Sequence, residues 1–282
     1  MQSRRWNLKW LAIALLGVVG IGLGAWSLIR PRQASPAEIR RQLMDELRPV
    51  TLKNCTLARF GGPGDGGYLM CGNLLGDIQG AYSYGIGGTD DWGCEFGSKF
   101  GLPVHQYDCF NLVQPVCNDG GRFVFHPECI GAVTTTIESR LFDTLANQIT
   151  KNGHGGKRLL VKMDVEGAEW DSLMATPDEV LDQIDQLPME LHGIDGERFP
   201  EVVRKLKRTF HLVHLHFNNM ACTVGMEPFP AFAFQVLFVN KRIGIPDASA
   251  GAPSLPHALD APDYPERTDC QTLSNAPRTA RD

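Results

Sequence analysis

The pattern of hydrophobic and polar positions is most informative in the middle of the chain, at residues 158–170. Apolar residues occupy positions 159–161 and 163, and the run ends in Asp164, which a short turn containing Gly167 follows. Such a run is typical of a buried parallel strand, and residues 168–174 favour a helix. Ligands in open α/β sheets bind at the carboxyl ends of the strands, so we expect Asp164 to face a crevice.

Six further apolar runs predict strands, and helical patterns separate most of them. We expect these strands at residues 80–84, 103–108, 123–126, 187–192, 211–219 and 232–239. Helices are predicted at residues 35–47, 90–100, 135–149 and 201–210, the third from a capping box and from apolar residues that step by four. Alternating strands and helices indicate an α/β domain.

A second stretch of interest is rich in glycine, at residues 61–67. Five of these seven positions are glycine, so the backbone must turn tightly or lie close to another group. The stretch predicts either a hairpin turn between two short strands or a loop that covers a ligand.

An apolar segment near the amino terminus predicts a membrane anchor. Residues 11–29 form an uncharged run of about 19 residues with Trp10 and Trp26 near its ends, long enough to cross the lipid bilayer. A cleaved signal peptide is the alternative, but the run is longer than usual and lacks a clean cleavage site. Three basic residues precede the run and four follow it, so we expect a single-pass membrane protein whose catalytic domain faces the cytoplasm.

These patterns divide the chain into four parts. The anchor occupies residues 1–32, a stalk helix and linker residues 33–55, and the catalytic domain residues 56–242. Residues 243–282 are dominated by Pro, Ala, Asp and Ser with few large apolar residues, which predicts a disordered tail.

Charge and cysteine content narrow the possible classes of function. The chain of 282 residues has a formal net charge of -5, which argues against a nucleic-acid partner. Its eight cysteines include no CxxC or CxxH pair, so neither a zinc site nor a redox dithiol is indicated. Half of the cysteines lie among apolar residues, where a free cysteine packs as a small hydrophobe. We therefore expect mostly reduced thiols.

A glycine turn and a spaced acid indicate a cofactor site. Gly85 and Gly87 follow the predicted strand at residues 80–84, and Asp108 ends the next strand about 20 residues later. In a Rossmann-like unit the turn lets a nucleotide approach the backbone, and the acid accepts hydrogen bonds from the ribose hydroxyls.

Polar residues at three strand ends predict the reactive site. Asp164 ends the central strand, Glu190 and His192 share one face at the end of the next, and His216 lies near the end of the strand after that. A carboxylate beside an imidazole suits general-base removal of a hydroxyl proton. The set Asp164, Glu190 and His192 could instead hold Mg or Mn, which would acidify a bound alcohol.

Residues 162–169 read KMDVEGAE and look like the K-x-D-x-E-G-x-E signature of FkbM-type S-adenosylmethionine-dependent methyltransferases, which the chain resembles. Residues 65–68, 83–87, 186–192 and 216–219 are similar to a membrane-anchored or secreted branch of these enzymes. The resemblance spans residues 56–241. It implies S-adenosylmethionine as cofactor, bound at Gly85, Gly87 and Asp108, with Glu128 and Ile130 beside the adenine. Ser83 and Tyr84 stand where many methyltransferases carry an acid.

The resemblance implies a Rossmann-like class I methyltransferase fold, with a seven-stranded, mostly parallel sheet and an antiparallel last strand. It also implies O-methylation of a hydroxyl on a sugar or other small or glycan acceptor. We expect Asp164, His192 and His216 to be catalytic. A metal-dependent glycosyltransferase that uses Asp164 and Glu166, and a non-catalytic protein with this fold, are the alternatives.

Overall fold

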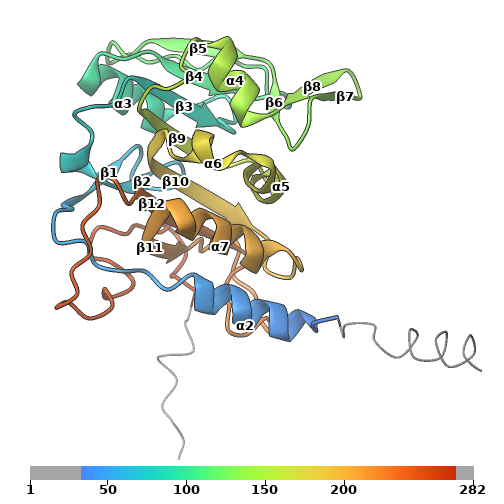
Figure 1. Ribbon diagram of the computed structural model, residues 1–282, viewed down its shortest axis with the longest axis vertical. Coiled ribbons are helices and arrows are strands. Elements are labelled where there is room, and N and C mark those ends of the chain that lie inside the picture. Colours follow the sequence, from blue (N-terminus) through green and yellow to red (C-terminus); the bar gives the residue numbers. More distant parts are fainter. Residues whose placement is uncertain (1–32, 271–282) are drawn as a thin grey trace, which may run out of the picture. The chain divides into compact units, whose positions relative to one another are not determined.

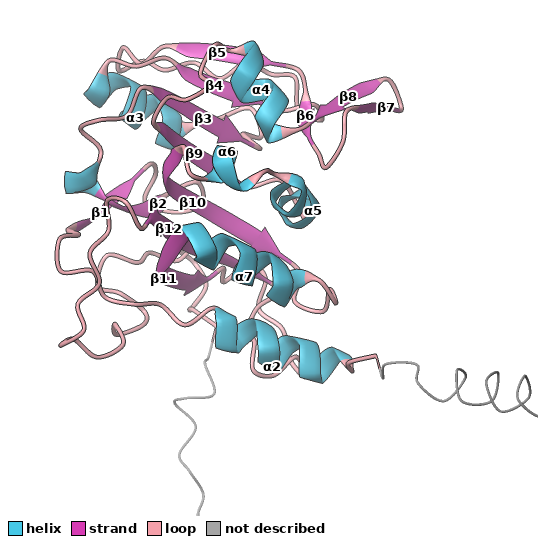
Figure 2. Cartoon of the chain, in the orientation of Figure 1, coloured by secondary structure: helices cyan, strands magenta, loops and turns pink. Residues whose placement is uncertain are grey.

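A mixed seven-stranded sheet is the centre of the computed structural model, which describes residues 33–270 (Figures 1 and 2). The strand order is β11-β12-β10-β9-β3-β4-β5. The strands of this sheet are β3 (Gly80–Tyr84), β4 (Val104–Tyr107), β5 (Phe123–His126), β9 (Leu159–Met163), β10 (Ile184–His192), β11 (Phe210–Phe217) and β12 (Ala233–Asn240). The helices are α2 (Pro36–Glu46), α3 (Asp91–Phe100), α4 (Leu145–Lys151), α5 (Ala168–Ala175), α6 (Asp178–Leu181) and α7 (Phe199–Thr209).

The strand directions agree with the predicted topology. Strands β5, β4, β3, β9 and β10 pair in parallel, and β12 pairs antiparallel with both β10 and β11. From β3 the chain continues outward to β4 and β5, and it later returns to the other side of β3 as β9. The order therefore reverses between β3 and β9, and at such a point an open α/β sheet leaves a crevice at the strand ends.

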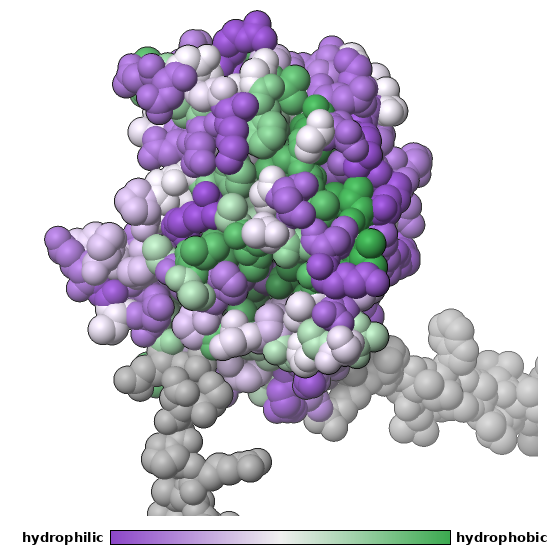
Figure 3. Space-filling view, turned by 90° about the vertical axis from the view of Figure 1, so that its left-hand side faces the viewer, coloured by the Kyte–Doolittle hydropathy of each residue, from purple (hydrophilic) through white to green (hydrophobic). Residues whose placement is uncertain are grey.

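Both faces of the sheet are buried, which explains the apolar runs of the sequence. On β9, Leu159, Val161 and Met163 belong to one hydrophobic cluster with residues of α2, α4, α5 and α7. Leu160 points the other way, into a second cluster with α3 and the hairpin of β1 (Leu57–Phe60) and β2 (Tyr68–Cys71). Figure 3 shows hydrophobic residues reaching the surface in the middle of one face, between hydrophilic regions.

Helix α2 lies where a stalk was predicted. Leu43 and Leu47 are fully buried in the first hydrophobic cluster, together with Leu206 of α7. The Nζ atom of Lys207 lies 2.8 Å from an Oε atom of Glu46 and ties the two helices together. These residues therefore belong to the packed core of the domain.

Residues 135–149 form a hairpin and a short helix, whereas one continuous helix was predicted. Strand β7 (Thr135–Ile137) pairs antiparallel with β8 (Arg140–Asp143), and β8 also pairs in parallel with β6 (Cys129–Ile130). Glu138 and Ser139 have positive φ angles of 50° and 65°, which form the tight turn of the hairpin. Only α4 remains of the predicted helix, capped by the Thr144 side chain.

The membrane prediction requires correction. The longest helices within residues 33–270, α2 and α7, have 11 residues each, whereas a bilayer span needs about 20. No helix in this part of the chain is long and apolar enough to cross a membrane. The run at residues 11–29 lies outside the described residues. The prediction of a single-pass membrane protein with a cytoplasmic domain is therefore not upheld.

The prediction of reduced thiols is wrong. All eight cysteines lie within the described residues and all are paired, as Cys55–Cys71, Cys94–Cys117, Cys109–Cys129 and Cys222–Cys270. The partners are 16 to 48 residues apart in sequence, and only the fold brings them together. Disulfides are typical of proteins that mature in an oxidising environment.

Residues 246–270, which composition predicts to be disordered, lie against the sheet. The Asp263 carboxylate accepts a hydrogen bond from the Gln235 side chain of β12 at 2.8 Å. The Asn219 side chain donates to the carbonyl oxygens of Tyr264 and Arg267, and Cys270 is bound to Cys222. Specific polar contacts and one disulfide thus replace the hydrophobic packing that this segment lacks.

We expect removal of the Cys222–Cys270 disulfide, in a Cys222→Ser/Cys270→Ser double variant, to lower the free energy of unfolding by ~2–4 kcal/mol. The bond closes a loop with a sequence separation of 48 and so restricts the unfolded chain. Urea denaturation measures the change, and limited proteolysis should show faster cleavage within residues 246–270. An unchanged unfolding free energy, or free Cys270 in the wild-type chain under non-reducing peptide mapping, would contradict this expectation.

Candidate active site

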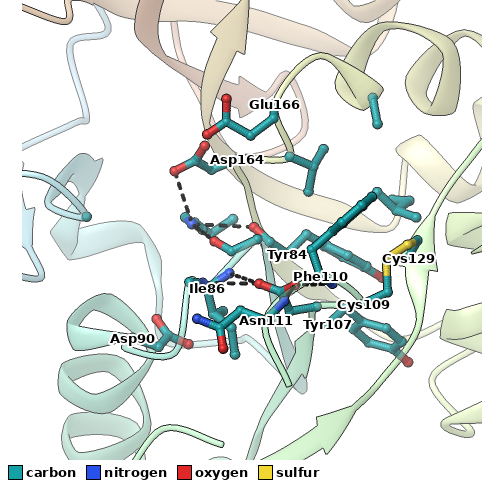
Figure 4. Close-up of a pocket in the computed structure, with 18 of the residues that line it drawn as sticks. Tyr84, Ile86, Asp90, Tyr107, Cys109, Phe110, Asn111, Cys129, Asp164 and Glu166 are labelled. Atoms are coloured by element: carbon teal, nitrogen blue, oxygen red, sulfur yellow. Dashed lines mark hydrogen bonds and ion pairs between the residues drawn. A yellow bond between two sulfur atoms is a disulfide. The ribbon is translucent and has the colours of Figure 1, made fainter. Parts of the chain in front are cut away.

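A pocket of about 650 Å³ lies at the carboxyl ends of β3, β4 and β9, where the strand order reverses (Figure 4). Asp164 and Glu166 lie together at one end of the view, and the Cys109–Cys129 disulfide lies near Tyr107 at the other. All the predicted cofactor residues line this pocket, namely Gly85, Gly87, Asp108, Glu128 and Ile130. The crevice expected from the sequence is therefore present at the expected strand ends.

The glycine turn after β3 lies very close to β9. Gly85 has a φ angle of 71°, and a Cβ atom added there would lie 1.5 Å from the carbonyl oxygen of Asp164. No other residue fits this position without a shift of the backbone. The buried Lys162 side chain donates to the carbonyl oxygen of Gly85 at 2.7 Å. Lys162 therefore holds the turn against the strand that carries Asp164.

Asp108 joins the glycine turn to the next loop. One carboxylate oxygen accepts from the backbone N–H groups of Ile86 and Gly87, at 3.3 and 3.1 Å. The other accepts from the N–H groups of Phe110 and Asn111, both at 2.8 Å. The side chain predicted to hold a ribose therefore also organises the backbone on two sides of the pocket.

The far side of the pocket is built by the loops after β4 and β5. The Cys109–Cys129 disulfide connects the loop after β4 to the start of β6, beside Ile130, and Tyr84 stacks on Tyr107 with ring centroids 4.8 Å apart. Glu128 lies 3.6 Å from the Nζ atom of Lys151 on α4. Flat aromatic and apolar surfaces with a few polar groups suit a planar heterocycle.

Asp164 is held from two sides. The Tyr68 hydroxyl, from β2, donates to its Oδ2 atom at 2.9 Å, and the Lys162 Nζ atom lies 3.5 Å from the same oxygen. Asp65, in the glycine-rich loop between β1 and β2, also lines the pocket. Residues 61–67 thus form the predicted hairpin turn, and two of them, Asp65 and Gly66, also border the pocket.

His192 lies beside Asp164, at the end of β10. Its Nδ1 atom is 2.9 Å from the Oε1 atom of Glu169, and its Nε2 atom lies 3.6 Å from Glu166 and 3.9 Å from Asp164. Glu190 also lies 3.9 Å from this Nε2 atom. Neither Glu190 nor His192 lines the pocket, although each has an atom close to a carboxylate oxygen of Asp164, which does.

The pKa values of Glu190 and His192 are both strongly raised. Burial and the nearby charge of Asp164 raise the pKa of Glu190 to about 8, against the opposing hydrogen bond from Asn218. Burial lowers the pKa of His192, but the hydrogen bond and charge of Glu169, with the charges of Glu190 and Asp164, outweigh it and raise the value to about 9. Shifted pKa values of this kind are typical of functional sites.

We expect the free energy of unfolding to fall as the pH rises from about 5 to about 9. In this window Glu190 and His192 keep protons in the folded chain that they lose in the unfolded chain, so each rise in pH favours unfolding. Urea denaturation at several pH values measures the slope. Glu190→Gln should flatten it below about pH 8, and Asp171→Asn, an exposed control, should not. Equal slopes in all three chains would refute the assignment.

His216 lies apart from the other predicted catalytic residues. Strand β12 lies between β10 and β11, and Gln235 of β12 is the register partner of both Glu190 and His216. Strands two positions apart are separated by about 10 Å. The His216 Nε2 atom instead lies 3.7 Å from Asp269. The structure therefore unites Asp164, Glu190 and His192 but not His216.

Among residues 33–270, two groups of three side chains have the spacing of metal ligands. In each group the ligand atoms lie within 4.8 Å of one another, and Asp164 belongs to both. One group is Asp164, Glu166 and His192, and the other is Asp65, Asp164 and Glu190. The predicted set of Asp164, Glu190 and His192 is thus divided between two groups.

The charge of the pocket is strongly negative. Lys162 is the one basic residue that lines it within the described chain, and its ammonium group is already bonded to the glycine turn. The acidic lining residues are Asp65, Asp90, Asp91, Asp108, Glu128, Asp164 and Glu166. A ligand with positive charge is therefore favoured over an anion.

Three residues of the site were assigned no role from sequence. Tyr68 and Asp65 belong to a short D-G-G-Y motif, and Glu169 ends the K-x-D-x-E-G-x-E motif. Their contacts join distant segments, such as the 96-residue separation between Tyr68 and Asp164, which no local pattern reveals. Their positions in these two motifs are the features of the sequence that could have indicated a role for them.

Comparisons with known proteins leave the family open. No protein-family model and no curated protein matches the chain. A solved structure described as an rRNA methylase from Streptococcus thermophilus matches 59% of this chain and 89% of its own, with 10% sequence identity and a TM-score of 0.35. Similarity at this level carries no functional argument, and membership of the FkbM-type methyltransferases stays a prediction.

Proposed function

We propose that this protein is an S-adenosylmethionine-dependent methyltransferase that transfers a methyl group to a hydroxyl acceptor. The observation that carries the proposal is the acid-lined pocket at the carboxyl ends of β3, β4 and β9, with Asp164 at one end and the glycine turn beside it. The seven-stranded, mostly parallel sheet with its antiparallel last strand, β12, agrees with the arrangement implied by the resemblance to this class of enzyme.

The charge of the pocket favours this cofactor over a nucleotide sugar. S-adenosylmethionine carries a sulfonium and an ammonium group, whereas the diphosphate of a nucleotide sugar carries negative charge. Seven acidic side chains line the pocket against one lysine, so a diphosphate would be repelled unless a metal ion neutralised it. The same argument disfavours a polyanionic acceptor such as a nucleic acid.

The proposed roles follow the position of each residue. Gly85 lets the turn lie against β9 where it borders the cofactor, and Gly87 leaves backbone space for the cofactor. Asp108 organises both neighbouring loops and faces the ribose, and Glu128 and Ile130 border the adenine. The bound cofactor supplies an electrophilic methyl group. Asp164 orients the acceptor hydroxyl. His192 accepts the proton of this hydroxyl, either directly or by way of Asp164, and Glu190 is close enough to His192 to exchange the proton with it.

A divalent cation is the alternative role for the acidic end of the pocket. Asp164 would then hold Mg or Mn either with Glu166 and His192 or with Asp65 and Glu190, and the ion would lower the pKa of the acceptor hydroxyl. A chelator separates the mechanisms, because it should stop turnover while cofactor binding persists only if a metal is used. Added magnesium or manganese should then restore the turnover.

Calorimetry of the full chain tests the proposed function. S-adenosylmethionine should bind without added metal, and UDP-glucose should not bind with or without magnesium or manganese. Binding of the nucleotide sugar that depends on metal would favour a glycosyltransferase. Binding of neither compound would favour a non-catalytic protein with this fold.

A further inference from the structure

We propose that Glu169 is a positioning residue that fixes the ring of His192 for proton transfer at the Asp164 end of the pocket. The role of Glu169 in the reaction rests on the proposed function. The arrangement of Glu169 and His192 can be tested without any turnover.

Glu169 and His192 form a close pair. Glu169 lies in the first turn of α5 and is fully buried. Its Oε1 atom lies 2.9 Å from the Nδ1 atom of His192, whose Nε2 atom then faces Asp164, Glu166 and Glu190. A carboxylate at Nδ1 keeps the proton on that nitrogen, so Nε2 is the atom left to exchange a proton with the site.

The same oxygen of Glu169 also fixes the turn that carries Glu166. The backbone N–H of Val165 donates to Glu169 Oε1 at 2.9 Å. Glu166, which follows, has a positive φ of 55°, an uncommon conformation for a residue other than glycine. One carboxylate thereby couples the β9–α5 turn to the end of β10. The indole N–H of Trp170 donates to the carbonyl oxygen of His192 at 2.7 Å and fixes its backbone as well.

This arrangement carries a free-energy penalty. The Oε2 atom of Glu169 is buried and has no hydrogen-bond partner in the described structure. A buried carboxylate with one unsatisfied oxygen is unfavourable, and a glutamine could form the bond to Val165 without the charge. The packing of α5 does not require a carboxylate here. A carboxylate adds negative charge beside His192, which stabilises the protonated ring and which a glutamine would not supply.

The test compares Glu169→Gln with Asp171→Asn, which removes an exposed acid from the same helical turn. In ¹⁵N NMR spectra of the full chain, Glu169→Gln should change the ring-nitrogen signals of His192, and Asp171→Asn should leave them unchanged. Affinity for S-adenosylmethionine, measured by calorimetry, should stay within about twofold in both variants, because Glu169 does not line the pocket.

Turnover is scored as release of S-adenosylhomocysteine with a panel of monosaccharides and methyl glycosides. Glu169→Gln should lower kcat by about 10- to 100-fold with little change in the KM for the cofactor, as is usual when the partner of a functional histidine is lost. In a His192→Ala background the same substitution should have no further effect, because its target is absent.

Three results would overturn the proposal: an unchanged His192 spectrum in Glu169→Gln, an unchanged kcat, or a full additional loss in the His192→Ala background, which would show a merely structural role. Absence of cofactor binding in the wild-type chain would instead overturn the proposed function. The His192 spectra would still decide whether Glu169 fixes the ring.

Discussion

Replacement of His192 by alanine is expected to lower the rate of methyl transfer by about 10²–10⁴-fold, the usual range for loss of a general base. His192 is the one predicted catalytic histidine that lies next to Asp164, with its Nε2 atom 3.9 Å from that carboxylate. Its pKa of about 9 means that the ring is mostly protonated at neutral pH. The wild-type rate should therefore rise with pH towards about 9, and His192→Ala should lose this rise.

Two other histidines provide the controls for this prediction. His211 lies in β11 at the opposite end from His216, so His211→Ala should keep the wild-type rate. His216 contacts Asp269 in the carboxyl-terminal segment, and His216→Ala should have a much smaller effect than His192→Ala. An equal loss in His216→Ala, or full activity in His192→Ala, would contradict the site as the structure presents it.

Asp108→Ala is expected to weaken binding of S-adenosylmethionine by roughly 2–4 kcal/mol, because charge-assisted hydrogen bonds are lost. Four backbone N–H groups, on the glycine turn and on the loop after β4, lose their shared acceptor. Both walls of the pocket should then become less ordered in addition to the loss of the ribose contact. Calorimetry measures the change in affinity.

Asp119→Asn is the matched control for Asp108, because it removes an exposed acid from the segment that follows the same strand. This variant should bind the cofactor as the wild type does. Unchanged affinity in Asp108→Ala would remove Asp108 from the binding site, and an equal loss in both variants would indicate a general effect of charge.

The protonation of Glu190 and His192 before a ligand binds affects both possible mechanisms. Glu190 and His192 share a small volume with Asp164, and the raised pKa values indicate that this group retains protons that isolated side chains would lose. A cationic ligand would favour release of these protons. With a neutral hydroxyl acceptor, His192 can act as a base only after it has lost its proton. Proton release on addition of magnesium, measured in a weakly buffered solution, would therefore support the metal mechanism.

The sequence by itself determined the elements that depend on local pattern. The strand at residues 123–126 was predicted with its observed bounds, and the central strand differs by one position or less. Strand β9 is buried on both faces, so its apolar run is continuous and easily recognised. Asp108 and Asp164 could be placed in the pocket because the carboxyl ends of parallel strands always meet at one edge of the sheet.

Local pattern failed where distant contacts compete with it. Residues 137, 141, 145 and 149 step by four as in a helix, yet pairing of β8 with both β6 and β7 draws the first part into a small sheet. Residues 246–270 have too few apolar residues to predict order, and they are held by polar contacts and a disulfide to other segments.

Only the tertiary structure decided which polar strand ends meet. His192 and His216 follow the same sequence pattern, but β12 inserts between their strands and separates them. In the sequence, Glu169 is simply one of the acids in a helical turn. The fold brings β10 beside it and places the Nδ1 atom of His192 2.9 Å from its Oε1 atom. Strand order and long-range pairing depend on contacts between residues far apart in the chain, and the local period of hydrophobic positions does not contain that information.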